Sequence, residues 1–145
     1  MASGYVLLTL ASLLPLMGCL QMRPNCSQLG QYALSENQRM QLFAGVNAHA
    51  PKREMNVSLV YQCALEGMAG VILENPQKPL TCSKSLGIFS LIFEIEEEPG
   101  VDSSVMNQAA LKEWEKDIPT LRFASTFGCN YIKEYGLHRY MCLFK

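Results

Sequence analysis

The chain has 145 residues, a length that suits one domain with one hydrophobic core. Its formal net charge of −1 at neutral pH leaves no basic surface, so nucleic acid is excluded as an expected partner. Apolar residues make up 49% of the chain, and the N-terminus inflates this fraction.

Residues 5–20 form an almost unbroken apolar stretch, YVLLTLASLLPLMGCL. It is shorter than the roughly 20 residues of a membrane-spanning helix and is typical of the apolar part of a secretory signal peptide. We therefore predict a signal peptide over residues 1–20, cleaved near Gly18 and Cys19, and a single domain over residues 21–145. An uncleaved signal anchor stays an alternative, because no Lys or Arg precedes the stretch.

Secretion would place the cysteines in an oxidising compartment, where they form disulfides. There are six cysteines, and whether Cys19 is retained decides whether all of them can pair or one thiol is left over. The remaining cysteines are Cys26, Cys63, Cys82, Cys129 and Cys142.

Two N-glycosylation sequons, at Asn25 and Asn56, also favour a secretory route. Such tripeptides arise by chance as well. Asn56 would equally suit the start of a helix as a capping residue.

The first helix is expected to begin after the cap residues Ser35-Glu36-Asn37 and to end at Gly45. A loop should follow over residues 47–54. Residues 55–74 carry a broad apolar stripe at helical spacing, which predicts a buried helix. The stripe consists of Leu59, Cys63, Met68 and Ile72, flanked by Val60, Leu65, Ala69 and Leu73.

Residues 75–85 contain two prolines and are predicted to be a connection. Residues 86–95 (LGIFSLIFEI) are apolar on both alternating faces, which favours a strand that helices cover on both sides. The sequence EEEPG at 96–100 should end it as a solvated turn. A helix over 101–117, ended by Pro119, is expected next. Its cap would be Asp102 or Ser103, and its inner face Val105, Ala109, Leu111, Trp114 and Ile118.

Residues 123–135 and 137–144 are predicted to be two antiparallel strands that turn at Gly136. They would join the sheet of residues 86–95, and a Cys129–Cys142 disulfide would hold their pairing. That bridge closes a loop of about 13 residues, which is worth about 3 kcal/mol in the chain-entropy model. The pairing of Cys26, Cys63 and Cys82 stays open. The order of helices and strands predicts an α/β layered domain.

Few side chains are suited to catalysis. Nothing in the spacing of His49 and His138 makes them converge, and no sequence motif of a zinc site, nucleophile elbow, phosphate loop or dinucleotide site occurs. Glu94 and the run Glu96-Glu97-Glu98 could be a cation site, but adjacent carboxylates cannot all face one ion. We therefore predict no catalytic residue, no metal site and no cofactor.

Residues 58–70, SLVYQCALEGMAG, carry a recognisable pattern, L-x-Y-x-C-x-L-E-x-x-A. Arg39 and Gly45 fit an R-x5-G pattern before it, and AALKEWEKDI, FGCNY and RYMCLF follow in order. By these motifs the chain, from about Cys26 to Lys145, resembles the CAP (SCP/TAPS) superfamily, as a short parasite-type member similar to nematode secreted antigens or coccidian surface antigens. The resemblance implies a three-layer α-β-α sandwich with a small, mostly antiparallel sheet, flanking helices and disulfides.

The chain departs from that superfamily at its central cavity. Ser35 stands where the first cavity histidine is expected, four residues before Arg39. LGIFSLIFE replaces the G-E-N-I strand motif, and PTLRFAST replaces the H-Y-T-Q-x-x-W stretch. The family's two-His, two-carboxylate ion site therefore has no counterpart here.

The resemblance implies a secreted, non-enzymatic antigen or host-interaction protein. It would bind an unidentified host protein or cell-surface ligand through the loops at 47–54 and 75–85. An extracellular sterol or fatty-acid carrier is the alternative, because some CAP proteins hold lipids between helices. Secretion or an extracellular surface location is expected, with no membrane span in the mature form.

Overall fold

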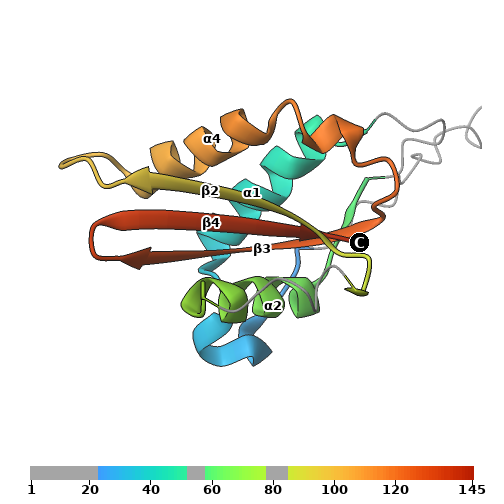
Figure 1. Ribbon diagram of the computed structural model, residues 1–145, viewed down its shortest axis with the longest axis horizontal. Helices are drawn as coiled ribbons and strands as arrows, with labels where there is room; N and C mark the ends of the chain where they lie inside the picture. Colours follow the sequence, from blue (N-terminus) through green and yellow to red (C-terminus); the bar gives the residue numbers. More distant parts are fainter. Residues whose placement is uncertain (1–22, 52–57, 78–84) are drawn as a thin grey trace, which may run out of the picture.

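The computed structural model describes residues 23–51, 58–77 and 85–145. In chain order the elements are η1 (Ser27–Tyr32), α1 (Glu36–His49), β1 (Val60–Tyr61), α2 (Cys63–Glu74), β2 (Phe89–Glu96), α4 (Ser103–Trp114), η2 (Ile118–Thr120), β3 (Thr126–Glu134) and β4 (Leu137–Phe144). Helices α1 and α4 lie on one side of the sheet and α2 on the other (Figure 1). The predicted α-β-α sandwich is confirmed.

Some predictions fall outside these ranges. The signal peptide, Cys19, Asn56 and Cys82 are not among the described residues, and these predictions stay untested. Within the described ranges, no helix has the length and apolar character needed to cross a membrane.

The sheet has the strand order β1-β3-β4-β2. β4 is antiparallel to both β2 and β3, whereas the short β1 is parallel to β3. Tyr135 and Gly136 connect β3 to β4 with φ angles of 51° and 76°. Positive φ at both turn residues gives a two-residue turn whose twist matches that of the flanking strands. In this register Cys129 lies opposite Cys142, and the two form the expected disulfide.

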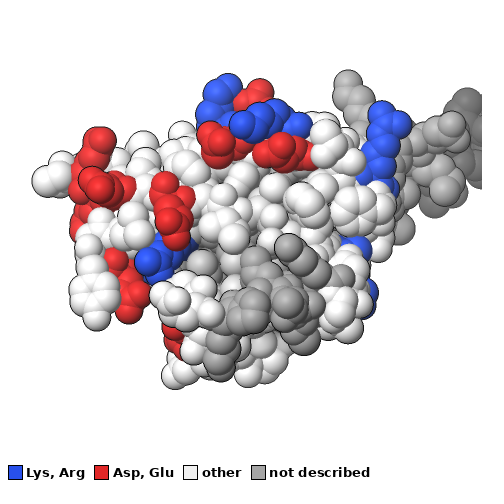
Figure 2. All heavy atoms as spheres, viewed as in Figure 1, with Lys and Arg blue, Asp and Glu red and all other residues white. Residues whose placement is uncertain are grey.

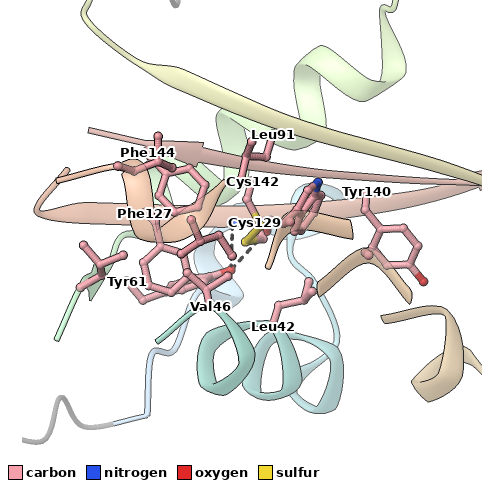
Figure 3. Close-up of a cluster of buried hydrophobic side chains, with 14 of the residues drawn as sticks. Leu42, Val46, Tyr61, Leu91, Phe127, Cys129, Tyr140, Cys142 and Phe144 are labelled. Carbon is pink, nitrogen blue, oxygen red and sulfur yellow. Dashed lines mark hydrogen bonds between the residues drawn. A yellow bond between two sulfur atoms is a disulfide. The ribbon is translucent and has the colours of Figure 1, made fainter. Parts of the chain in front are cut away.

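Each face of the sheet has its own buried cluster. On the side of α1 and α4, Leu42 and Val46 of α1 pack against Phe127 and the Cys129–Cys142 disulfide (Figure 3). On the side of α2 the cluster is smaller and consists of Leu65, Ala69, Leu73, Ile88, Met141 and Leu143. Alternation along β3 and β4 therefore supplies both cores, as expected for a sheet between two helical layers.

The prediction of one helix over residues 55–74 is wrong in its first part. Val60 and Tyr61 form β1, and α2 begins at Cys63. The Val60 amide donates to the carbonyl of Ser125, and the Gln62 amide donates to that of Phe127, at 2.7 Å. A β-branched and an aromatic residue favour this extended backbone, and the parallel pairing with β3 supplies its hydrogen bonds.

Gly45 does not end the first helix, because α1 continues to His49. The predicted loop at 47–54 therefore begins later than expected. A Cβ atom on Gly45 would lie 2.2 Å from Cδ1 of Leu111 on α4. The glycine lets two helices approach each other, a role that the sequence pattern alone does not distinguish from a helix end.

The predicted helix over residues 101–117 is shorter, and its inner face is confirmed in the second half only: Trp114 and Ile118 are buried, and Leu111 packs against the same core. Val105 is 51% exposed, whereas Met106, Asn107, Ala110 and Trp114 are buried. Asp102 is the cap, and Pro119 lies in η2 rather than at the end of α4. In the first half of the helix, Val105 and Ala109 have the same spacing as the buried Met106 and Ala110, so only the packing against α1 selects between the two pairs.

The expectation that helices cover both sides of β2 is also wrong. β2 is an edge strand, and α2 packs over β3 and β4 instead. Leu91 is buried, but Ile92 on the opposite face is 46% exposed. The indole Nε1 of Trp114 donates a hydrogen bond to the Ile92 carbonyl at 3.4 Å. This bond gives a partner to one backbone group of the edge strand.

Candidate functional site

A buried ion pair connects the two helical layers. Glu66 on α2 is fully buried, and its Oε2 accepts from Arg39 Nε of α1 at 2.7 Å and from the Tyr61 hydroxyl at 2.7 Å. Its Oε1 accepts from Arg39 Nη2 at 2.9 Å and from the Leu34 amide at 2.7 Å. Four donors thus satisfy both carboxylate oxygens, as a buried charge requires.

The same network reaches the sheet through Tyr61. Its hydroxyl accepts from the Cys129 amide at 3.3 Å, next to the disulfide (Figure 3). Burial, followed by the Glu66 charge, raises the pKa of Tyr61, and the hydrogen bond with Glu66 raises the pKa of Arg39. Tyr61 and Arg39 are thus stabilised in their protonated forms. The network holds the two helical layers to the sheet, and its residues are those of the recognised motif.

We expect stability to fall steeply above pH about 10, where tyrosines of the unfolded chain ionise. Burial raises the pKa of Tyr61 and of Tyr140, so both stay protonated in the folded state at pH values where the unfolded chain has lost those protons. Each tyrosine should then lower the free energy of unfolding by about 1.4 kcal/mol per pH unit. Urea unfolding across this pH range measures the slope.

Tyr140→Phe is the informative variant for this expectation. The Tyr140 hydroxyl is buried and has no hydrogen-bond partner within the described chain. Its removal should leave stability at neutral pH unchanged or slightly higher and should lower the alkaline slope by the share of one tyrosine, about 1.4 kcal/mol per pH unit. An unchanged slope would show that Tyr140 is not protected from ionisation.

A small polar cavity of about 110 Å³ lies beside Ser35, the residue that stands where the resemblance places the first cavity histidine. Ser35 lines it, and its hydroxyl caps α1 by accepting from the Gln38 amide at 3.3 Å. Glu74 is the one carboxylate in the lining, and it accepts from the Tyr32 hydroxyl at 3.0 Å. No histidine lines the cavity. A single carboxylate that already accepts a hydrogen bond does not provide the three or four ligands that a transition metal takes from protein.

The two histidines lie on different elements and have separate partners. His49 Nδ1 is 2.9 Å from the Gly45 carbonyl, within α1. His138 on β4 is buried, and its Nδ1 is 2.9 Å from the Tyr131 hydroxyl. Among residues 23–51, 58–77 and 85–145, no group of three or more His, Cys, Asp or Glu side chains is arranged to hold a metal ion.

Two acidic residues at the end of β2 pair with cations of β4 and β3. Glu94 contacts Arg139 at 3.1 Å, and Glu97 contacts Lys133. The hydrogen bond from Lys133 lowers the pKa of Glu97. Figure 2 shows the acidic side chains spread around this end of the molecule and not gathered in a hollow. Glu96 belongs to β2, so the strand extends one residue into the predicted turn.

An exposed apolar surface lies at the opposite end of β2. Phe89 and Phe123 are 44% and 60% exposed, and their rings make an edge-to-face contact with centroids 6.3 Å apart. Leu86 is 50% exposed and follows the predicted loop at 75–85. We call Leu86, Phe89 and Phe123 the aromatic end. Sequence reasoning placed all three residues in strands, and it missed this surface because exposure depends on strand order.

A second disulfide joins Cys26 to Cys63 and ties the segment before η1 to the start of α2. Asn25 next to it is exposed, and its side-chain oxygen accepts from the Ser27 amide at 3.1 Å. The surface position suits the predicted glycosylation, which stays a prediction.

A model of the family described as "Ancylostoma-associated secreted protein related" matches residues 26–144. The fold is similar to that of "Ancylostoma-secreted protein Ac-ASP-7", with a TM-score of 0.60 and 19% identity over 77% of this chain and 69% of that one. For "Manganese-bound Ac-ASP-7" the TM-score is 0.60, with 19% identity over 77% and 70% of the two chains. For "NaASP2 with Zn2+" it is 0.57, with 14% identity over 77% and 80%. No curated protein sequence matches the chain.

Proposed function

Because the chain belongs to the Ancylostoma-associated secreted protein related family, a nematode-type branch of the CAP superfamily, we propose that it is a secreted binding protein without enzymatic activity. Its target would be a host protein or a host cell-surface ligand. The two disulfides among the described residues fit an extracellular location.

The aromatic end is the observation that carries this proposal. Contiguous exposed apolar side chains mark interaction sites on soluble proteins, and aromatic residues are enriched at such interfaces. Phe89 and Phe123 come from distant parts of the chain but lie in contact, held by β2 and by the segment between η2 and β3. Leu86 directly follows the predicted binding loop at 75–85 in the sequence.

The test is a Phe89→Ser/Phe123→Ser double variant of the secreted protein, measured for binding to host cells. Both side chains are largely exposed, so the variant should keep its circular dichroism spectrum and lose at least tenfold in affinity, the effect of removing about 1.4 kcal/mol of contact. Val105→Ser is the matched control, because Val105 is similarly exposed but lies near the start of α4, at the far end of the sandwich (Figure 1). Equal binding by the double variant and the control would contradict the proposal.

The sterol or fatty-acid carrier stays an alternative prediction. Where Gly45 meets Leu111, α1 and α4 are in direct contact, which leaves no space for an acyl chain between them at this point. A native mass spectrum of the secreted protein would test this alternative. A carrier would show the added mass of a bound ligand, and that added mass would be lost on denaturation.

A further inference from the structure

A cavity of about 460 Å³ opens beside the start of α1, away from the aromatic end. Its volume lies within the range of small-molecule sites. Apolar side chains of Pro24, Ala33 and Leu34 form part of the lining. Polar and charged residues complete it: Arg23, Asn25, Ser27, Glu36 and Arg39.

Arg39 gives this cavity a buried cation with unused donor capacity. Its side chain is only 5% exposed, and Glu66 and the Leu34 carbonyl occupy Nε and Nη2. Within the described parts of the chain, Nη1 donates no hydrogen bond, and Arg39 is one of the residues that line the cavity. A guanidinium has five N–H donors in a fixed plane. Nη1 can therefore donate to an acceptor in the cavity without disturbing the pair with Glu66.

The start of α1 adds a second favourable field for an anion. The Gln38 and Arg39 amides are satisfied by Ser35, whereas those of Glu36 and Asn37 have no acceptor in the described chain. The amino end of a 14-residue helix carries a partial positive charge.

The rim contains an ion pair that a ligand can replace. Arg23 Nη1 and Glu36 Oε1 are 3.5 Å apart, with side chains 77% and 71% exposed, so their attraction is weak. Glu36 now supplies the only carboxylate on the cavity wall. An incoming carboxylate can take its place beside Arg23, and Arg39 lines the same cavity.

We propose that this cavity binds a small carboxylate ligand. The carboxylate accepts from Arg39 Nη1 and lies near Arg23 and the amino end of α1, while the carbon chain lies against Pro24, Ala33 and Leu34. The site is separate from the aromatic end, so a negative binding result at this cavity would leave the proposed function unaffected.

The test is an NMR titration of the isotope-labelled full-length secreted chain with acetate, butanoate and hexanoate, at neutral pH and constant ionic strength. Shifts should concentrate at the amides of Glu36 and Asn37 and at the Arg39 Nε–H. Affinity should rise by up to roughly fourfold for each added methylene group that is buried.

Two variants locate the site without touching the buried pair. Arg23→Gln should weaken butanoate binding by roughly two- to fivefold, and Glu36→Gln should strengthen it by a similar factor because it removes the competing carboxylate. Lys112→Gln is the control: Lys112 is an exposed α4 residue paired with Glu115, and the variant should bind as the parent does. Shifts elsewhere, or indifference to both rim variants, would overturn the proposal. So would equal binding of inorganic phosphate with no dependence on chain length.

Discussion

Glu66→Ala is expected to lower the free energy of unfolding by about 3–5 kcal/mol, because it leaves the buried Arg39 guanidinium without its counter-ion. The Leu34 amide and the Tyr61 hydroxyl lose an acceptor in the same change. Since a small domain has only about 5–15 kcal/mol of stability, the variant should be largely unfolded at mild urea concentrations. Urea unfolding followed by circular dichroism gives the value.

Glu74→Ala is the matched control on the same helix. Glu74 is exposed and accepts one hydrogen bond, from Tyr32, so its loss should cost about 1 kcal/mol or less. An Arg39→Met/Glu66→Leu variant should recover much of the loss, because replacing both charges removes the uncompensated cation. A Glu66→Ala effect no larger than that of Glu74→Ala would show that water reaches Arg39 and that the pair does not hold the layers together.

Gly128→Ala is expected to cost about 3 kcal/mol or more, at the upper end of overpacking effects. A Cβ at this position in β3 would lie 2.5 Å from the Glu66 amide nitrogen and 2.6 Å from the Gln62 carbonyl oxygen. Both contacts are with backbone at the start of α2, which cannot rotate away as a side chain can. The helix would have to move off the sheet, and the Arg39–Glu66 pair would move with it.

Gly45→Ala separates this effect from a general intolerance of buried glycines. Its new Cβ would meet the Leu111 side chain, which can change rotamer, and alanine is favoured over glycine in a helix by about 1 kcal/mol. We expect a net change within about 1 kcal/mol, measured by the same unfolding experiment. If both alanine variants were equally stable, the close approach of α2 to β3 would not depend on Gly128.

The sequence predicted most elements of the fold but missed the short strand β1. Residues 86–95 and 137–144 were recognised as strands because their apolar runs are long and bounded by turn residues. The two-residue β1 was missed because a short extended segment carries no periodicity of its own. Its apolar residues instead extended the helical stripe of α2.

For the candidate sites, the residues could be recognised in the sequence but their contacts could not. The motif residues Arg39, Tyr61 and Glu66 were visible in the sequence, but their mutual ion pair and hydrogen bonds were not, because these join segments far apart in the chain. The aromatic end was hidden for the same reason. Phe89 and Phe123 resemble core residues until the strand order places β2 at the edge of the sheet.

The sequence by itself thus determined the family pattern, the identity of most helices and strands, the turn at Gly136 and the candidate partners of its last disulfide. These properties depend on local spacing and on short-range backbone preferences. Tertiary structure alone decided which residues begin the inner face of α4, the role of Gly45, the Cys26–Cys63 pairing and which apolar and charged groups face solvent. Those outcomes depend on which surfaces meet when distant segments pack, and local pattern carries no information on that choice.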